Sequence, residues 1–106
     1  DESTPCIINC ESPQSCRYAQ IHCHRNSSQT CIINLNAQSS AQFSSIFTHR
    51  SPIIYINALN SYCLQDATIY AHQQLGSKLF VFAREYDSIR RGTLYAPVGE
   101  GSLLSM

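Results

Sequence analysis

The sequence predicts an all-β fold, a short parallel β-solenoid of about four rungs with about 25 residues in each rung. Three observations predict this fold class. One spacing pattern of small or apolar residues occurs four times, each copy holds two short stretches of alternating apolar and polar residues, and the segments between them are rich in Ser, Asn, Gln and Gly. No stretch has the periodicity and length of a convincing helix.

The repeat consists of six positions whose separations are 2, 2, 6, 5 and 2 residues in every copy, with offsets of 25, 23 and 25 residues between copies. We expect a single domain of residues 1–106, and in it equivalent residues of successive rungs stack in columns about 4.8 Å apart. The first column is Cys6, Cys31, Ile54 and Leu79. The expected rungs are 6–30, 31–53, 54–78 and 79–103, and residues 104–106 begin a fifth.

Each rung is expected to contain two strands, because alternation with β-branched residues is typical of strands. The stretches 31–35 and 45–48 show the pattern best. The matched positions place the first strand of each rung at 6–10, 31–35, 54–58 and 79–83, and the second at 21–23, 46–48, 69–71 and 94–96.

Charge and motifs argue against several classes of function. Lys plus Arg and Asp plus Glu number seven each, and the absence of a basic block argues against a nucleic-acid partner. No apolar run is long enough to cross a bilayer. The sequence has no phosphate-binding loop or nucleophile elbow, so we expect no catalysis and no cofactor. The column His24, His49 and His72 lacks a fixed acidic or thiol neighbour, so we expect stacked or corner-capping histidines rather than a metal site.

The six cysteines indicate disulfide bonds and an oxidising compartment, because no Cys-x-x-Cys pair is present. Asn26 begins a glycosylation sequon, which predicts an N-linked glycan and secretion. Spacing leaves the pairing open. Cys10 and Cys16 flank one bend and could bridge it, Cys6 could reach either Cys23 or Cys31, and Cys63 could stay free or bridge to another chain.

The first rung carries the runs Cys6-Ile7-Ile8-Asn9-Cys10 and Ile21-His22-Cys23. With these runs the chain resembles the right-handed parallel β-helix family, and more narrowly the cysteine-rich secreted β-solenoids of microbial eukaryotes. The resemblance covers residues 6–106, although later rungs replace Cys by Leu, Ala or Thr. It implies a right-handed coil stapled by disulfides near its N-terminal end, an extracellular location and a role in filaments.

Three outward columns are distinctive. Two are apolar or aromatic, and such strips either stabilise the sheet through neighbouring side chains or pack laterally against a partner. A third is rich in Asn, which we expect to form a structural amide ladder. The columns are Ile7, Ile32, Tyr55 and Phe80; His22, Phe47, Tyr70 and Tyr95; and Asn9, Asn34, Asn57 and Phe82.

The two ends of the coil predict self-assembly. Residues 1–5 are too few for a capping helix, and Leu104 and Met106 continue the columns of Leu79 and Val81. Open ends of this kind favour head-to-tail pairing with another copy. We therefore expect an extracellular filament or matrix subunit in which the tail of one copy meets the front of the next and completes the broken rung. The expected assembly residues are Asp1, Pro5, Cys6, Leu103, Leu104 and Met106.

The main alternative is a binding module, an adhesin or carbohydrate-binding coil that uses the outward Tyr and Asn columns. Ice binding is less favoured, because the column Gln20, Ser45, Thr68 and Thr93 is too mixed for a regular Thr face. A polysaccharide-active enzyme is least favoured, because four rungs offer a short groove and the acids do not cluster.

Overall fold

The computed structural model describes residues 6–23, 30–49, 51–72, 76–85, 87–99 and 101–105. These residues form nine strands and no helix. The chain alternates between two parallel sheets, so the fold is a parallel β-solenoid of about four turns, which confirms the predicted fold class. Sheet A contains β1 (Cys6–Cys10), β3 (Cys31–Leu35), β5 (Ile53–Ala58), β7 (Lys78–Ala83) and β9 (Leu103–Ser105). Sheet B contains β2 (Gln20–His22), β4 (Ser45–Phe47), β6 (Thr68–Tyr70) and β8 (Thr93–Tyr95).

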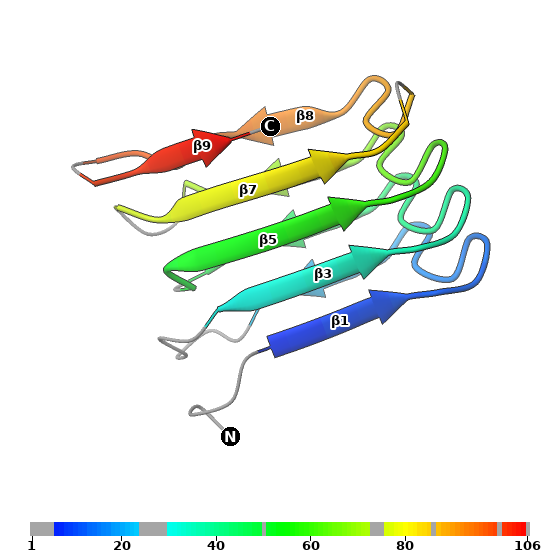
Figure 1. The fold of residues 1–106 in the computed structure, drawn as a ribbon, viewed down its shortest axis with the longest axis horizontal. Coiled ribbons are helices and arrows are strands. Elements are labelled where there is room, and N and C mark those ends of the chain that lie inside the picture. The colour runs from blue at the N-terminus through cyan, green and yellow to red at the C-terminus, as the bar shows by residue number, and fades with distance from the viewer. Residues whose placement is uncertain are drawn as a thin grey trace.

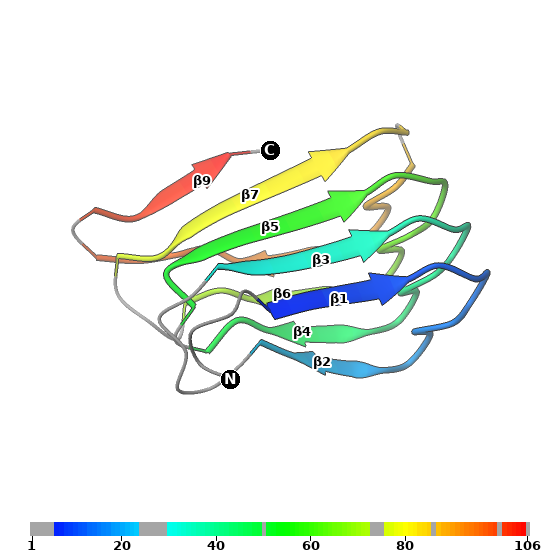
Figure 2. The ribbon, with the colours of Figure 1, turned by 60° about the horizontal axis from the view of Figure 1, so that its bottom comes forward.

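The coil is right-handed, as Figure 1 shows. The strands of sheet A cross the front of the view from left to right, the strands of sheet B return behind them, and the coil rises from β1 to β9. Figure 2 shows the two sheets as separate layers joined by stacked turns. Right-handed crossovers are the rule for parallel strands within one sheet.

The register of both sheets confirms the predicted offsets. In sheet A, Cys6 pairs with Cys31, Cys31 with Ile54, Ile54 with Leu79, and Leu79 with Leu104. In sheet B the inward column is Ile21, Ile46, Ile69 and Leu94. Each strand therefore lies directly above its equivalent in the preceding rung.

The core lies between the sheets and is built from the inward columns. Full burial of a Leu or Ile side chain contributes about 1.5–3 kcal/mol, so the middle rungs carry most of the stabilisation. At the ends the core opens, and Ile8 and Leu94 are only partly buried. Fully buried apolar side chains include Ile33, Leu35, Ile46, Ile54, Ile56, Leu64 and Leu79.

The turns after sheet A use left-handed backbone positions without glycine. Gln14, Ser39 and Tyr62 share one such column, with φ of 62°, 57° and 57°. A left-handed conformation costs a non-glycine residue about 1–2 kcal/mol. Hydrogen bonds between successive turns offset this cost, as Cys16 N donates to Ser40 O over 2.7 Å and Ala41 N to Cys63 O over 2.9 Å.

Candidate assembly surfaces

The last strand of sheet B presents an unpaired backbone edge. Thr93 N donates to Ala67 O and Ala71 N donates to Tyr95 O, both over 2.9 Å. Because the backbone groups of consecutive residues in a strand point to opposite sides, the N–H and C=O of Leu94 face away from β6. Among the described residues no strand lies on that side of β8.

The first strand of sheet B presents the complementary edge. Ser45 N donates to Ala19 O and Cys23 N donates to Phe47 O, both over 2.9 Å, so the backbone groups of Ile21 face β4. The groups of Gln20 and His22 then face the open side. In the described part of the chain, β8 therefore exposes the N–H and C=O of Leu94 at one end of sheet B, and β2 exposes those of Gln20 and His22 at the other end. Gln20 and His22 flank Ile21, which lies in the column of Leu94.

Sheet A ends in a short strand that covers only part of its neighbour. β9 pairs with Lys78, Leu79 and Phe80 of β7, and no described strand lies beyond Val81–Ala83. All three residues of β9 are exposed, and the Phe82 side chain is 59% exposed. Leu103 and Leu104 lie in β9, and Cys6 begins β1 with its N donating to Thr30 O over 3.0 Å. Asp1, Pro5 and Met106 lie outside the described residues.

The aromatic column on sheet B forms a continuous stack. Ring centroids are 4.7 Å apart for His22 and Phe47, 4.8 Å for Phe47 and Tyr70, and 5.2 Å for Tyr70 and Tyr95, with interplanar angles of 4–8°. Parallel rings this close lie face to face, so their edges meet solvent while their faces cover one another. A sugar-binding platform needs free ring faces, and this stack offers them only at its two ends, His22 and Tyr95.

The outer face of sheet A combines an apolar column with an amide ladder. Ile7 is 57% exposed, and Tyr55 and Phe80 stack at 5.1 Å. The amides of the ladder bond to one another along the axis. Ile32 completes the apolar column, and the ladder bonds are Asn34 Nδ2 to Asn9 Oδ1 and Asn57 Nδ2 to Asn34 Oδ1, each 2.9 Å.

The structure describes two of the three histidines of the predicted column, and each of them contacts the neighbouring aromatic column. His49 lies beside His22 of the neighbouring column, with 2.7 Å between His22 Nδ1 and His49 Nε2. His72 packs at a tilt against Tyr70 and Tyr95. His24 lies outside the described residues. Over the described ranges, no three His, Cys, Asp or Glu side chains are grouped so as to hold a metal ion.

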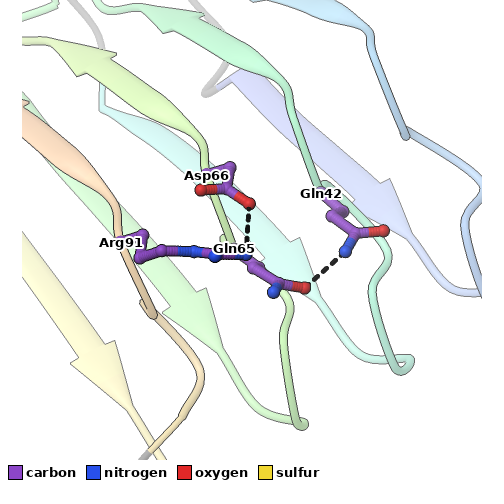
Figure 3. A network of polar contacts seen from close by, with 4 residues as sticks. All are labelled: Gln42, Gln65, Asp66 and Arg91. Atoms are coloured by element: carbon purple, nitrogen blue, oxygen red, sulfur yellow. Dashed lines mark hydrogen bonds and ion pairs between the residues drawn. The ribbon is translucent and has the colours of Figure 1, made fainter.

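The turn face carries a polar network that sequence reasoning missed (Figure 3). Gln42 Nε2 donates to Gln65 Oε1, and Arg91 Nη2 donates to Asp66 Oδ2 over 3.0 Å. Both pairs could have been found from the sequence, because their members are 23 and 25 residues apart and these are the offsets of the repeat. An exposed ion pair is worth about 0–1 kcal/mol, so this network adds little stability. Beside it, Tyr18 and Phe43 stack at 5.0 Å with Arg17 over both rings.

Two disulfide bonds lie in the N-terminal part of the described chain. Cys10 is bonded to Cys16 across a bend, with a Cα–Cα distance of 5.9 Å. Cys23 is bonded to Cys31 with a Cα–Cα distance of 6.1 Å, a pairing that the sequence reasoning had not weighed. Cys6 forms neither of the bonds considered for it and is a free thiol. The disulfides are consistent with an extracellular location.

Cys63 is a buried free thiol that occupies a serine position of the turn. Its Sγ donates to Asn60 O over 3.0 Å and accepts from Asn60 N over 3.3 Å. One rung later Ser88 Oγ accepts from Glu85 N over 3.1 Å and also donates to Asn60 O over 3.0 Å. Cys63 Sγ therefore accepts the same bond as Ser88 Oγ, from the backbone N–H three residues earlier in its own turn.

We expect Cys63→Ser to unfold with nearly the wild-type free energy, because the hydroxyl makes the same bonds. Cys63→Ala removes the acceptor of Asn60 N–H, and a backbone donor left without its partner costs about 1–3 kcal/mol. Urea denaturation of the two variants measures the difference. Equal stability of Cys63→Ala and wild type would show that the thiol does not support the turn.

The glycosylation sequon at Asn26 lies outside the described residues. Among the described residues there is no helix with the length and hydropathy needed to span a bilayer. Comparison with protein-family models, with curated proteins and with solved structures found no match to this chain.

Proposed function

We propose that this solenoid is a structural subunit that stacks head to tail with further copies of itself into an extracellular filament or matrix fibre. The observation that carries the proposal is the complementarity of its two open ends. Leu94 N–H and C=O face outward at one end, and the backbone groups of Gln20 and His22 face outward at the other. In a continued parallel register Leu94 N donates to Gln20 O, and His22 N donates to Leu94 O.

The columns also match across such a contact. Residues 8–23 of one copy would lie on residues 81–96 of the other, since these segments are equivalent in the repeat. Ile21 then covers the partly buried Leu94, and the ring of His22 stacks on the free face of Tyr95. The contact buries an apolar core slice and extends both sheets without a gap.

β9 competes with this contact. Leu104 and Cys6 belong to the same column, so β9 of one copy and the first residues of β1 in the next need the same place beside β7. β9 is three residues long and exposed throughout, and among the described strands it pairs only with β7. It is therefore the segment that leaves the sheet when copies stack, rather than a part of the completed rung.

The lateral columns support a second contact between neighbouring filaments. The outer face of sheet A exposes Ile7, Tyr55 and Phe82 and has Lys78 as its only charged residue among the described positions. Sheets with such faces pack about 10 Å apart. The binding-module alternative has less support, because the ring faces that a sugar would need are covered within the aromatic stack.

Sedimentation velocity over a range of concentrations tests the proposal. We expect wild type to form larger species as concentration rises. Leu104→Asp weakens the packing of β9 and should assemble at lower concentration, because β9 no longer protects the edge. Monomers of both proteins at every concentration would refute head-to-tail stacking. Assembly of wild type but not of Leu104→Asp would show instead that β9 is part of the contact.

A further inference from the structure

Three cysteines of the first two rungs, Cys6, Cys23 and Cys31, are neighbours at the N-terminal end of the core. Cys6 and Cys31 are partners in the register of β1 and β3. Cys31 is fully buried and bonded to Cys23, while Cys6 is a free thiol that packs against the same core cluster. One disulfide bond therefore lies beside a third sulfur that is chemically able to attack it.

The positions of these residues make two pairings geometrically similar. Cys6 and Cys31 each begin a strand of sheet A, one rung apart, and Cys23 directly follows β2 of sheet B. Neighbouring strands are about 4.8 Å apart, and disulfides span Cα distances of about 4.4–6.8 Å. Cys23 now bonds upward to the second rung with a Cα–Cα distance of 6.1 Å. Cys6 occupies the position equivalent to Cys31 one rung lower, which is the rung of Cys23 itself.

We propose that Cys6 is the nucleophile of an internal thiol–disulfide exchange site. The Cys6 thiolate attacks Cys23 Sγ, a bond forms between these two sulfurs, and the bond between Cys23 and Cys31 breaks. The electron pair leaves on Cys31 Sγ, which takes up the proton that Cys6 lost. The number of disulfide bonds is unchanged, so the step consumes no oxidant or reductant.

The exchange changes what the disulfide holds together. The bond between Cys23 and Cys31 ties the first rung to the second. A bond between Cys6 and Cys23 joins the start of the first rung to its end and anchors the edge strand β1. This chemistry does not depend on the stacking of copies, because all three sulfurs belong to one chain.

Peptide mapping tests the proposal, with Cys63→Ser as the parent so that Cys6 is the one free thiol among the described cysteines. The folded protein is incubated without reductant at about pH 8.5, where a typical thiol is about half deprotonated. Samples are quenched with acid and blocked with N-ethylmaleimide before tryptic digestion. Cleavage after Arg17, Arg25 and Arg50 separates the three cysteines onto peptides 1–17, 18–25 and 26–50.

At the start we expect a disulfide between peptides 18–25 and 26–50. Over time a second species should appear, in which peptides 1–17 and 18–25 are linked and peptide 26–50 carries maleimide. The Cys6→Ser variant should never form the second link. A constant first link with Cys6 fully labelled at all times would overturn the proposal. As a second test, Cys31→Ser treated with oxidised glutathione should form the Cys6–Cys23 bond in the folded chain, with reduced glutathione released. Failure to form this bond would show that the sulfurs do not meet.

Discussion

Leu94→Pro should abolish assembly while leaving the solenoid folded. Among the described residues Leu94 N–H has no backbone partner, because the neighbouring Thr93 and Tyr95 make the bonds to the preceding rung. Proline is tolerated in an edge strand when its missing N–H faces solvent. At a stacked end the same change removes a donor and leaves Gln20 O of the next copy unpaired. An unpaired group of this kind costs about 1–3 kcal/mol, which is about 5-fold to 150-fold in affinity at each contact.

Leu94→Ala is the matched control, since it removes more apolar side chain than proline does but keeps the N–H. We expect Leu94→Ala to assemble at a moderately higher concentration than wild type and Leu94→Pro to stay monomeric. Sedimentation velocity measures the assembly, and far-ultraviolet circular dichroism shows whether each variant is folded. Equal assembly of the two variants would argue against strand pairing through β8.

Ile56→Ala should destabilise the monomer more than any comparable change at the ends. Ile56 is fully buried in a middle rung, so its truncation leaves a cavity between the sheets and costs about 2–5 kcal/mol. Small domains are stable by about 5–15 kcal/mol, so this change removes much of the total. Leu104→Ala alters an inward column at the end, where the side chain is 38% exposed, and should cost less than about 1 kcal/mol.

Urea denaturation compares the two substitutions directly. We expect Ile56→Ala to lower the free energy of unfolding much more than Leu104→Ala, because the core is closed in the middle and open at its end. Similar losses at both positions would contradict that distribution of burial.

The fold was predictable because inward residues of a solenoid must be apolar at fixed spacing. Cys31, Ile54 and Leu79 differ in chemistry, yet each is buried in the same column, and this shared burial carried the register. The amide ladder through Asn34 was predictable for the same reason, as identical residues recur at the repeat offset.

The disulfide pairing and the histidine contacts were not predictable from columns. Cys6, Cys23 and Cys31 all lie near one corner of the core, so spacing alone left the choice among them open. The pair of His22 and His49 joins neighbouring columns, whereas the repeat aligns only equivalent residues within one column.

The left-handed turn positions and the role of β9 were not predictable for other reasons. The left-handed positions of the turns carry Gln14 and Ser39 rather than glycine, so composition gave no signal for them. The competition between β9 and an incoming strand becomes visible only once Leu79 and Leu104 are seen to pair. Both features depend on backbone geometry more than on side-chain type.

The most direct test of head-to-tail stacking is electron cryomicroscopy of wild-type protein concentrated under non-reducing conditions. Stacking by continued strand pairing predicts filaments with a regular repeat of about 4.8 Å along their axis that runs unbroken from one copy to the next. In the reconstruction, residues 8–23 of each copy should lie on residues 81–96 of its neighbour. Dispersed single coils, or filaments whose copies touch only through their sides, would contradict it.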